Sequence, residues 1–388
     1  MQKLLTVFIS YLFCLIVLVF CIKNYGKIDV GAYTQNSKLI VNNWKELKLI
    51  KTLGTPVLDF NSSENSTSFY ISHPPFSYYF LYFSNIILGI NDYIWINVII
   101  TSITAFFIFL IVNTIFLNKA QLRFSRIAFI SGLLYLLNPH VVYFQVFNFH
   151  PDIFVQVFLV VFTYIILKLF YKNRYHSPKY LILIFIILFL MSYSSWLGIF
   201  YTMTIISISF FNLRKQYKMF VPTITASIAF LLALSIVLIQ YATVDGTWNF
   251  ITSFKNLYLK ESYLNVDFIH AQKNILIHFF KSFWPFFIIY SFLAYTTLRG
   301  HQMRFLFTKN GYRYLVLSFM PFFFFYIFLF NYAQNEYTIL YFIPVLIVIT
   351  LVWCEKLKVN VDKKILLPVL SIYFILNFMI YLQIFFNR

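Results

Sequence analysis

Long apolar runs alternate with short polar segments along most of the chain. The first run, residues 4–22, holds no charged residue; it ends in Phe20-Cys21-Ile22 and is followed by Lys23. A helix needs about 20 mostly apolar residues to cross a bilayer, and the run lacks the small-residue cleavage site of a removed signal peptide. It therefore predicts a retained first helix. The same pattern predicts eleven membrane-spanning helices, at 4–22, 93–117, 127–147, 153–171, 180–194, 195–212, 221–243, 278–298, 313–332, 339–354 and 365–386.

A further apolar segment, residues 73–90, is short, begins with two prolines and is rich in Tyr and Phe. The distribution of charge indicates that it does not span. If it lies at the outer interface, most of the 30 basic residues fall in inner loops, and only Glu355 and Asp362 of the 12 acids do. Short inner loops of membrane proteins are enriched in Lys and Arg. We therefore expect a juxtamembrane helix at 73–90 on the outer face.

The composition excludes several classes of protein. The chain is 61% hydrophobic and only 11% charged, whereas soluble domains carry about 25% charged residues. The net charge of +18 follows from basic inner loops, so we expect no nucleic-acid partner. Cys14, Cys21 and Cys354 all lie in apolar runs and are predicted to be packed thiols. The fold class expected is an all-α integral membrane protein, a bundle of about 11 helices with juxtamembrane helices in the first outer loop.

Two long outer loops are predicted within a single membrane domain, residues 1–388, with no soluble C-terminal domain. They run from 23 to 92 and from 244 to 277. Residues 32–52 interleave apolar and basic positions, which fits an amphipathic helix on the membrane surface or a short helix packed in the bundle. Residues 59–67 are polar and are expected to form a flexible loop.

Four acids and histidines near the outer membrane plane are the first candidates for chemistry, because ionisable groups at that depth are expensive. Asp29 follows the first span and could accept a proton, or it could be a solvated acid that caps a helix. His73 precedes two prolines that suit a helix start, and it could bind a phosphate or a sugar, or be incidental to the turn. Asp152, with His150, opens the span 153–171, where the helix dipole also favours an acid.

Weaker signals lie elsewhere on the outer face. Trp196 sits at the tip of a tight helical hairpin and is more often an interface anchor. Glu336 and Tyr337 fall in a short outer loop, and His270 and Lys273 near the second long loop could pair with a lipid phosphate. The sequence has no Walker loop, dinucleotide fingerprint, zinc-ligand spacing or nucleophile elbow, so we expect no ATP-driven step within this chain.

In this order, these features resemble the membrane-embedded GT-C glycosyltransferases, specifically the superfamily of protein O-mannosyltransferases and aminoarabinose transferases. The resemblance covers most of the chain in layout. Four segments carry it: Asp29 to Tyr33; His73-Pro74-Pro75 to Tyr78-Tyr79; Pro139, Tyr143 and Pro151-Asp152; and Asn335-Glu336-Tyr337 with Tyr341 to Pro344. Many members have a pair of acids in the first loop, whereas Asp29 is alone in this motif. That departure argues against a metal-dependent reaction, although it does not exclude a divalent ion.

The resemblance implies an inverting transfer of a sugar from a polyprenyl-phosphate donor to a lipid, glycan or protein acceptor, at a membrane whose lipids surround the site. Asp29 would be the general base, and Asp152 would position the acceptor or orient a histidine. The expected site residues are Asp29 and Asp152 as catalytic groups, Tyr33, His73, Tyr78, His150, Trp196, His270, Lys273, Glu336 and Tyr337 as substrate-binding groups, and no metal ligand or cofactor. A bacterial plasma membrane, with the site on its outer face, is the expected location.

Two other classes of function remain open. The chain could transport or flip lipid-linked sugars, or it could be a non-catalytic assembly partner. A transporter would need polar groups near the bilayer midplane, where the predicted spans have few.

Overall fold

The structure is a computed structural model of the 388-residue chain. It describes residues 2–25, 32–61, 66–69, 73–89, 92–117, 126–172, 174–212, 219–246, 309–329, 341–357 and 375–386, together with short pieces between 249 and 291 and residue 372. All structural statements below concern these residues.

Helices make up most of the described chain. They are α1 (Gln2–Tyr25), α2 (Ala32–Leu47), α3 (Phe76–Leu88), α4 (Tyr93–Leu117), α5 (Arg126–Leu136), α6 (Pro139–Val141), α7 (Ile153–Lys172), α8 (Pro178–Ser194), α9 (Gly198–Asn212), α10 (Phe220–Asp245), α13 (Lys309–Phe328) and α15 (Ile343–Leu357). Two π-helical stretches, η1 (Val142–Phe147) and η6 (Leu382–Phe386), and two strands, β1 (Val57–Asn61) and β2 (Ser66–Phe69), complete the described elements.

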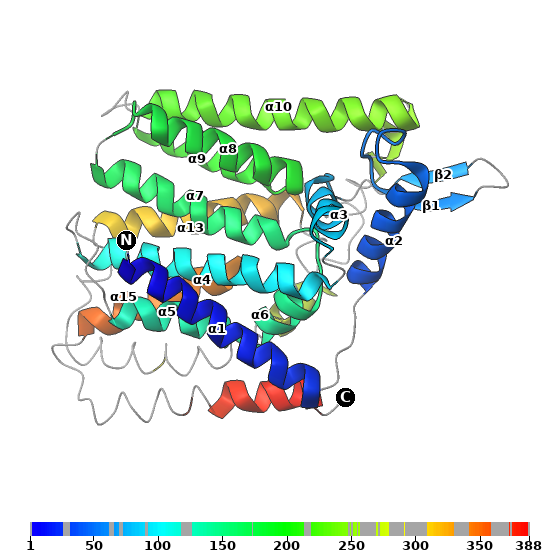
Figure 1. The fold of residues 1–388 in the computed structure, drawn as a ribbon. Coiled ribbons are helices and arrows are strands. Elements are labelled where there is room, and N and C mark those ends of the chain that lie inside the picture. Colours follow the sequence, from blue (N-terminus) through cyan, green and yellow to red (C-terminus); the bar gives the residue numbers. More distant parts are fainter. Residues whose placement is uncertain are drawn as a thin grey trace.

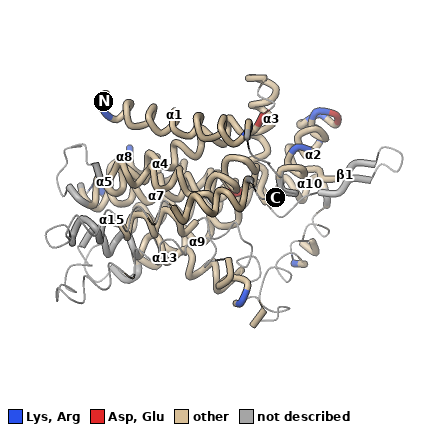
Figure 2. The backbone as a smooth tube through the Cα atoms, turned by 90° about the horizontal axis from the view of Figure 1, so that it is seen from below, with Lys and Arg blue, Asp and Glu red and all other residues tan. Residues whose placement is uncertain are grey.

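The long helices stack side by side in one bundle, while α2, α3 and the two strands gather at one end of it (Figure 1). We call this the outer end. The N-terminus of α1 lies at the opposite end, and the last described helix finishes near the outer end. Within the bundle, α10 packs on α8, and α4 packs on both α5 and α7. Charged residues lie mainly at helix ends and on α2, as the coloured backbone in Figure 2 shows for the described residues.

Four described helices are long and apolar enough to cross a membrane: Gln2–Asn24, Tyr93–Ile115, Ile153–Tyr171 and Phe220–Val244. They match four of the predicted spans and make the structure compatible with a multi-pass membrane protein. Shorter apolar helices, among them Pro178–Ser194 and Gly198–Ser209, occupy other predicted spans. The number of eleven is therefore not shown, and the predicted span 278–298 falls almost wholly outside the described residues.

The predicted span 127–147 is bent rather than straight. Ala128–Leu136 and Pro139–Phe147 meet at 55°. The break lies at Asn138, because a residue before proline avoids the helical region and Pro139 has no N–H to continue the ladder. Asn138 adopts an extended conformation, and its side chain accepts hydrogen bonds from the N–H groups of His140 and Val141. The bend directs the following segment towards the outer end.

Close packing joins α1 to α5. The Tyr11 hydroxyl donates to the Phe129 carbonyl at 2.7 Å, and the Tyr11 and Phe129 rings stack with centroids 5.2 Å apart. The Tyr11 ring also lies over Gly132, where an added Cβ would come within 2.3 Å of the ring carbon Cζ. Small residues allow such close helix approach in membrane proteins.

The first outer loop differs in part from the prediction. Residues 32–47 form the expected helix α2, but its apolar face packs inside the protein, where Ile40 and Trp44 are fully buried with Val57 and Tyr78. The Trp44 indole N–H donates to the Thr55 carbonyl at 2.8 Å. This packing favours the bundle-helix alternative over a helix lying on the membrane.

The prediction that residues 59–67 form a flexible loop is wrong for the described part of the segment. Strands β1 and β2 pair antiparallel there, with Phe60 opposite Thr67 and Asn61 opposite Ser66. A two-stranded hairpin is only marginally stable by itself. Contact of β1 with α2, including hydrogen bonds from the Asn43 side chain to the carbonyls of Val57 and Leu58, supplies the support that the local sequence lacks.

Candidate functional site

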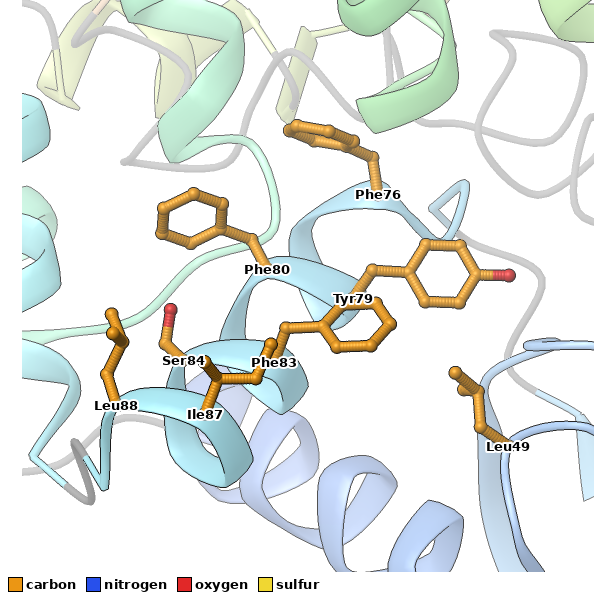
Figure 3. Close-up of a pocket in the computed structure, with 8 residues that line it drawn as sticks. All are labelled: Leu49, Phe76, Tyr79, Phe80, Phe83, Ser84, Ile87 and Leu88. Atoms are coloured by element: carbon orange, nitrogen blue, oxygen red, sulfur yellow. The ribbon is translucent and has the colours of Figure 1, made fainter.

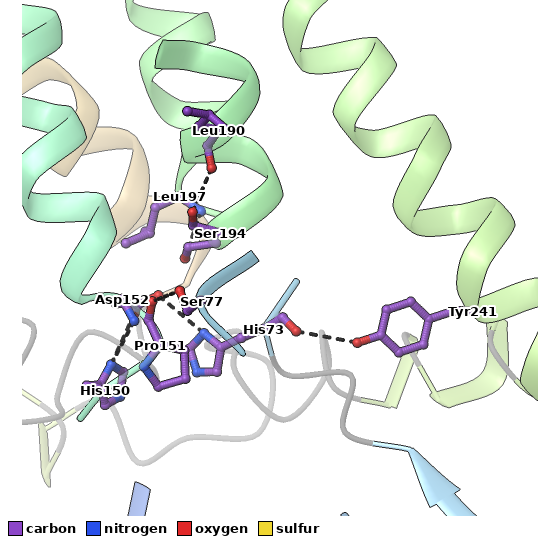
Figure 4. A network of polar contacts seen from close by, with 10 residues as sticks. His73, Ser77, His150, Pro151, Asp152, Leu190, Ser194, Leu197 and Tyr241 are labelled. Carbon is purple, nitrogen blue, oxygen red and sulfur yellow. Dashed lines mark hydrogen bonds and ion pairs between the residues drawn. The ribbon is translucent and has the colours of Figure 1, made fainter. Parts of the chain in front are cut away.

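Three ionisable side chains meet at the outer end. The His73 Nδ1 lies 3.2 Å from Asp152 Oδ1, and the His150 Nδ1 lies 3.9 Å from Asp152 Oδ2. The two imidazole rings meet edge to face, with centroids 5.4 Å apart. All three residues are buried, with 2% of His73, 7% of His150 and 3% of Asp152 exposed. Figure 4 shows His73 joined to the Asp152 carboxylate and His150 joined to the Asp152 backbone N–H. We call these three residues the His–Asp–His cluster.

The segment that carries His150 and Asp152 is held by α4. Asn97 of α4 donates from its side-chain amide to the carbonyls of Val146 and Asn148, at 3.1 and 3.2 Å. The Tyr93 hydroxyl, from the first turn of α4, donates to the Phe147 carbonyl at 2.8 Å. These bonds provide donors to carbonyls at the end of the π-helical stretch η1, because no further helical turn supplies backbone N–H groups there.

Two further helices hold the same segment closer to the cluster. Thr34 of α2 accepts a hydrogen bond from the Phe149 N–H at 2.8 Å, and the Ser77 hydroxyl of α3 donates to the Pro151 carbonyl. His150 and Asp152 flank Pro151, so their backbone is fixed from three sides. The Asp152 N–H in turn donates to His150 Nδ1 at 3.2 Å, which keeps a lone pair on that nitrogen.

His73 reaches the cluster from the turn that starts α3. Pro74 and Pro75 are buried, and their fixed φ angles make this entry rigid. The Tyr241 hydroxyl of α10 donates to the His73 carbonyl at 3.4 Å (Figure 4). The cluster therefore joins two chain segments that are far apart in sequence and connects them to α10.

Burial dominates the electrostatics of His150. Burial is the main cause that lowers the pKa of His150 from 6.5 to about 3; the Asp152 carboxylate opposes this effect, and His73 adds to it. A buried imidazole without full compensation stays neutral. His150 is thus a neutral lone-pair donor near pH 7, not a cation.

An apolar groove of about 620 Å³ runs along α3, the helix that begins shortly after His73. Phe76, Tyr79, Phe80 and Phe83 line it, with Leu49 on the opposite side (Figure 3). Figure 3 also labels Ser84, Ile87 and Leu88, which extend the lining towards the end of α3. The groove begins at Phe76, one helical turn after His73. Its lining suits a hydrocarbon chain.

The structure brings together three of the predicted site residues, His73, His150 and Asp152, and places others elsewhere. Tyr78 is 1% exposed and packs edge to face on Trp44, with centroids 6.4 Å apart, so it stabilises the α2–α3 contact. Trp196 packs with Val237 and Tyr241 and borders the site only through Tyr241.

The remaining predicted residues are not assembled with the cluster by any described contact. His270 and Lys273 are exposed. Asp29, Glu336 and Tyr337 lie outside the described residues, and for Tyr33 only the backbone, in the first turn of α2, is described.

Sequence reasoning missed that the cluster can hold a metal ion. His73, His150 and Asp152 each offer one ligand atom, and these atoms lie within 4.8 Å of one another, close enough for small side-chain shifts to bring them onto one ion. The His-x-Asp spacing at 150–152 was a signal, but the third ligand lies far upstream and only the fold brings it near. The positioning residues Thr34 and Asn97 had no signal in the sequence.

No protein-family model and no curated protein matches this chain.

Proposed function

We propose that the chain is an inverting glycosyltransferase that moves a sugar from a polyprenyl-phosphate donor to a lipid, glycan or protein acceptor at the outer face of the membrane. One observation carries the proposal: a buried cluster of two imidazoles and a carboxylate includes His73, which lies just before α3, the helix that lines an apolar groove. A lipid-linked sugar has both chemistries, a polar phosphate head and a hydrocarbon tail.

The groove on α3 would hold part of the lipid tail, and the cluster would face the head. Phe76 connects the two features, since it lines the groove and its ring contacts Phe154 in the first turn of α7, with centroids 5.3 Å apart. Asp152 immediately precedes α7. A donor seated along α3 would therefore place its phosphate within reach of the cluster.

The reaction would be a single displacement. The acceptor oxygen attacks the anomeric carbon, the bond from that carbon to the phosphate oxygen breaks, and the phosphate leaves with the electron pair. Asp29 would take the hydroxyl proton as general base, which contributes about 10²–10⁴-fold. The leaving phosphate is already charged and needs electrostatic stabilisation. Asp152 would orient His73 for that task, in keeping with their 3.2 Å separation; His270 and Lys273 are further candidates.

The arrangement of the bundle supports the wider layout of this proposal. The described chain begins at one end of the bundle and finishes near the other (Figure 1), as an odd number of crossings such as eleven requires. Few charged residues lie along the described spans, which favours an enzyme with its site at one face over a transporter with a polar midplane site. We place this face outside a bacterial plasma membrane.

Transfer of labelled sugar from a panel of polyprenyl-phosphate donors tests the proposal, with purified protein in lipid vesicles. Wild type should transfer sugar with inversion, and both Asp29→Asn and Asp152→Asn should reduce turnover by at least about 100-fold, within the range of a lost general base. Asp92→Asn is the matched control, because Asp92 is an acid at the same end that pairs with Lys23. It should keep full turnover.

Each outcome discriminates. Activity retained in Asp29→Asn but lost in Asp152→Asn would move the base to Asp152. Wild-type protein that transfers no sugar from any donor, yet carries labelled lipid across the vesicle membrane, would replace the enzyme by a transporter. A protein that shows neither sugar transfer nor lipid transport would be assigned the role of an assembly partner.

A further inference from the structure

We infer that His73, His150 and Asp152 form a binding site for one divalent transition metal ion of zinc-like chemistry. The candidate ligand atoms lie within 4.8 Å of one another, so small shifts of the side chains would bring them to the separations that a bound ion imposes. Zn–N and Zn–O bonds of about 2.0–2.1 Å at tetrahedral angles place neighbouring ligand atoms roughly 3.3 Å apart. The cluster has 3.2 Å between His73 Nδ1 and Asp152 Oδ1, and 3.9 Å between His150 Nδ1 and Asp152 Oδ2.

The donor set selects the class of metal. Imidazole nitrogen suits zinc, copper, iron and nickel, whereas calcium and magnesium prefer oxygen ligands. Two imidazoles and one carboxylate are also three ligands, and zinc sites with three protein ligands keep a fourth position open. The cluster thus matches a reactive site rather than a closed structural one.

The site is organised before any ion binds. Ser77 holds the Pro151 carbonyl, and Thr34 accepts from the Phe149 N–H, so His150 and Asp152 leave the backbone in fixed directions. The hydrogen bond from the Asp152 N–H leaves the lone pair of His150 on Nδ1. Metal binding would exchange this hydrogen bond for a coordinate bond. Supporting contacts of this kind typically change metal affinity by about 10–100-fold.

The open position would take an anionic oxygen, and in the proposed reaction that is an oxygen of the lipid-linked phosphate. This second step rests on the proposed function, whereas metal binding itself does not. The positive ion would offset charge that builds on the leaving phosphate. It would add to the electrostatic stabilisation without replacing the general base.

The first experiment measures metal binding alone. The full chain is purified in detergent, stripped with a chelator, titrated with Zn²⁺, and its bound metal is counted after desalting. We expect one Zn²⁺ per chain, and loss of affinity by more than about 100-fold, beyond the effect of a supporting contact, in His73→Gln, His150→Gln and Asp152→Asn. His140→Gln, which removes a buried histidine outside the cluster, and His270→Gln, which removes an exposed one, should bind as wild type does.

A spectroscopic measurement on wild type keeps the inference testable if a variant fails to fold. Co²⁺ bound to the stripped protein should give the intense visible absorption of a four-coordinate nitrogen and oxygen site. Addition of inorganic phosphate should shift that spectrum by filling the open position. Wild type that binds no stoichiometric metal, or cluster variants that bind as tightly as wild type, would overturn the site.

The two proposals fail separately. A metal-loaded protein that transfers no sugar would retain the site and remove the function. A Co²⁺ spectrum that phosphate leaves unchanged would retain the metal and remove the open position for the substrate. If protein that binds no metal still transfers sugar, the proposed function stands and the metal site does not. The cluster would then be a hydrogen-bonded histidine–carboxylate group.

Discussion

Asn97 tests whether the fold, rather than the ligands alone, builds the site. Its side chain is fully buried and donates to the carbonyls of Val146 and Asn148 at 3.1 and 3.2 Å. Asn97→Leu keeps a similar volume but removes both donors. A buried hydrogen bond contributes about 1 kcal/mol net, and a carbonyl left without a partner costs about 1–3 kcal/mol. Since a carbonyl has a second lone pair that neighbours can satisfy, we expect a loss of about 2–3 kcal/mol.

The loss should appear in two measurements. The free energy of unfolding in detergent should fall by that amount, and the affinity for Zn²⁺ should fall by about 10–100-fold, as for a contact that supports metal ligands. Asn113→Leu is the matched control, because Asn113 is buried in the same helix and its Oδ1 accepts no hydrogen bond within the described residues. It should be neutral or stabilising. An Asn97→Leu protein as stable as wild type, with unchanged metal affinity, would refute the reasoning.

Three further outcomes are expected. In chelator-treated protein, His150 is neutral when folded but takes up a proton below about pH 6.5 when unfolded. Its contribution to the free energy of unfolding is therefore complete above pH 6.5 and falls by about 1.4 kcal/mol at pH 5.5. A denaturation series against pH should show this slope, and His150→Gln should flatten it. Gly132→Ala should destabilise by about 1–3 kcal/mol through overpacking, and thermal unfolding should show partial rescue when Tyr11 is also shortened to Ala. Asp92→Asn, which breaks the partly exposed pair with Lys23, should change the unfolding free energy by at most about 1 kcal/mol, and a larger change would contradict its surface character.

The sequence allowed the helical class of the fold to be predicted. A bilayer requires about 20 apolar residues per crossing, and that requirement is local, so spans such as 4–22 and 93–117 could be read directly and match α1 and α4. The juxtamembrane helix at 73–90 was predicted from charge asymmetry, and α3 occupies that segment. Local chemistry of this kind needs no knowledge of distant contacts.

What the sequence did not reveal depended on such contacts. Residues 59–67 were predicted to form a loop because they are polar, whereas the pairing of residues 59–61 with residues 66–68 depends on support from α2. Tyr78 was predicted to bind substrate because it follows a suggestive motif, and only the structure shows that it packs with Trp44 and Val57. Neither burial nor pairing is encoded in a short window of sequence.

The sequence by itself predicted long apolar helices of the kind found in multi-pass membrane proteins, and it singled out His73, His150 and Asp152 as candidates, because apolar length and charge sign act residue by residue. Only the tertiary structure decided which of those groups meet. His73 and Asp152 come together because α3, α4 and the segment that opens α7 pack at the outer end, and the precision of that packing, rather than the presence of the residues, makes metal binding an option.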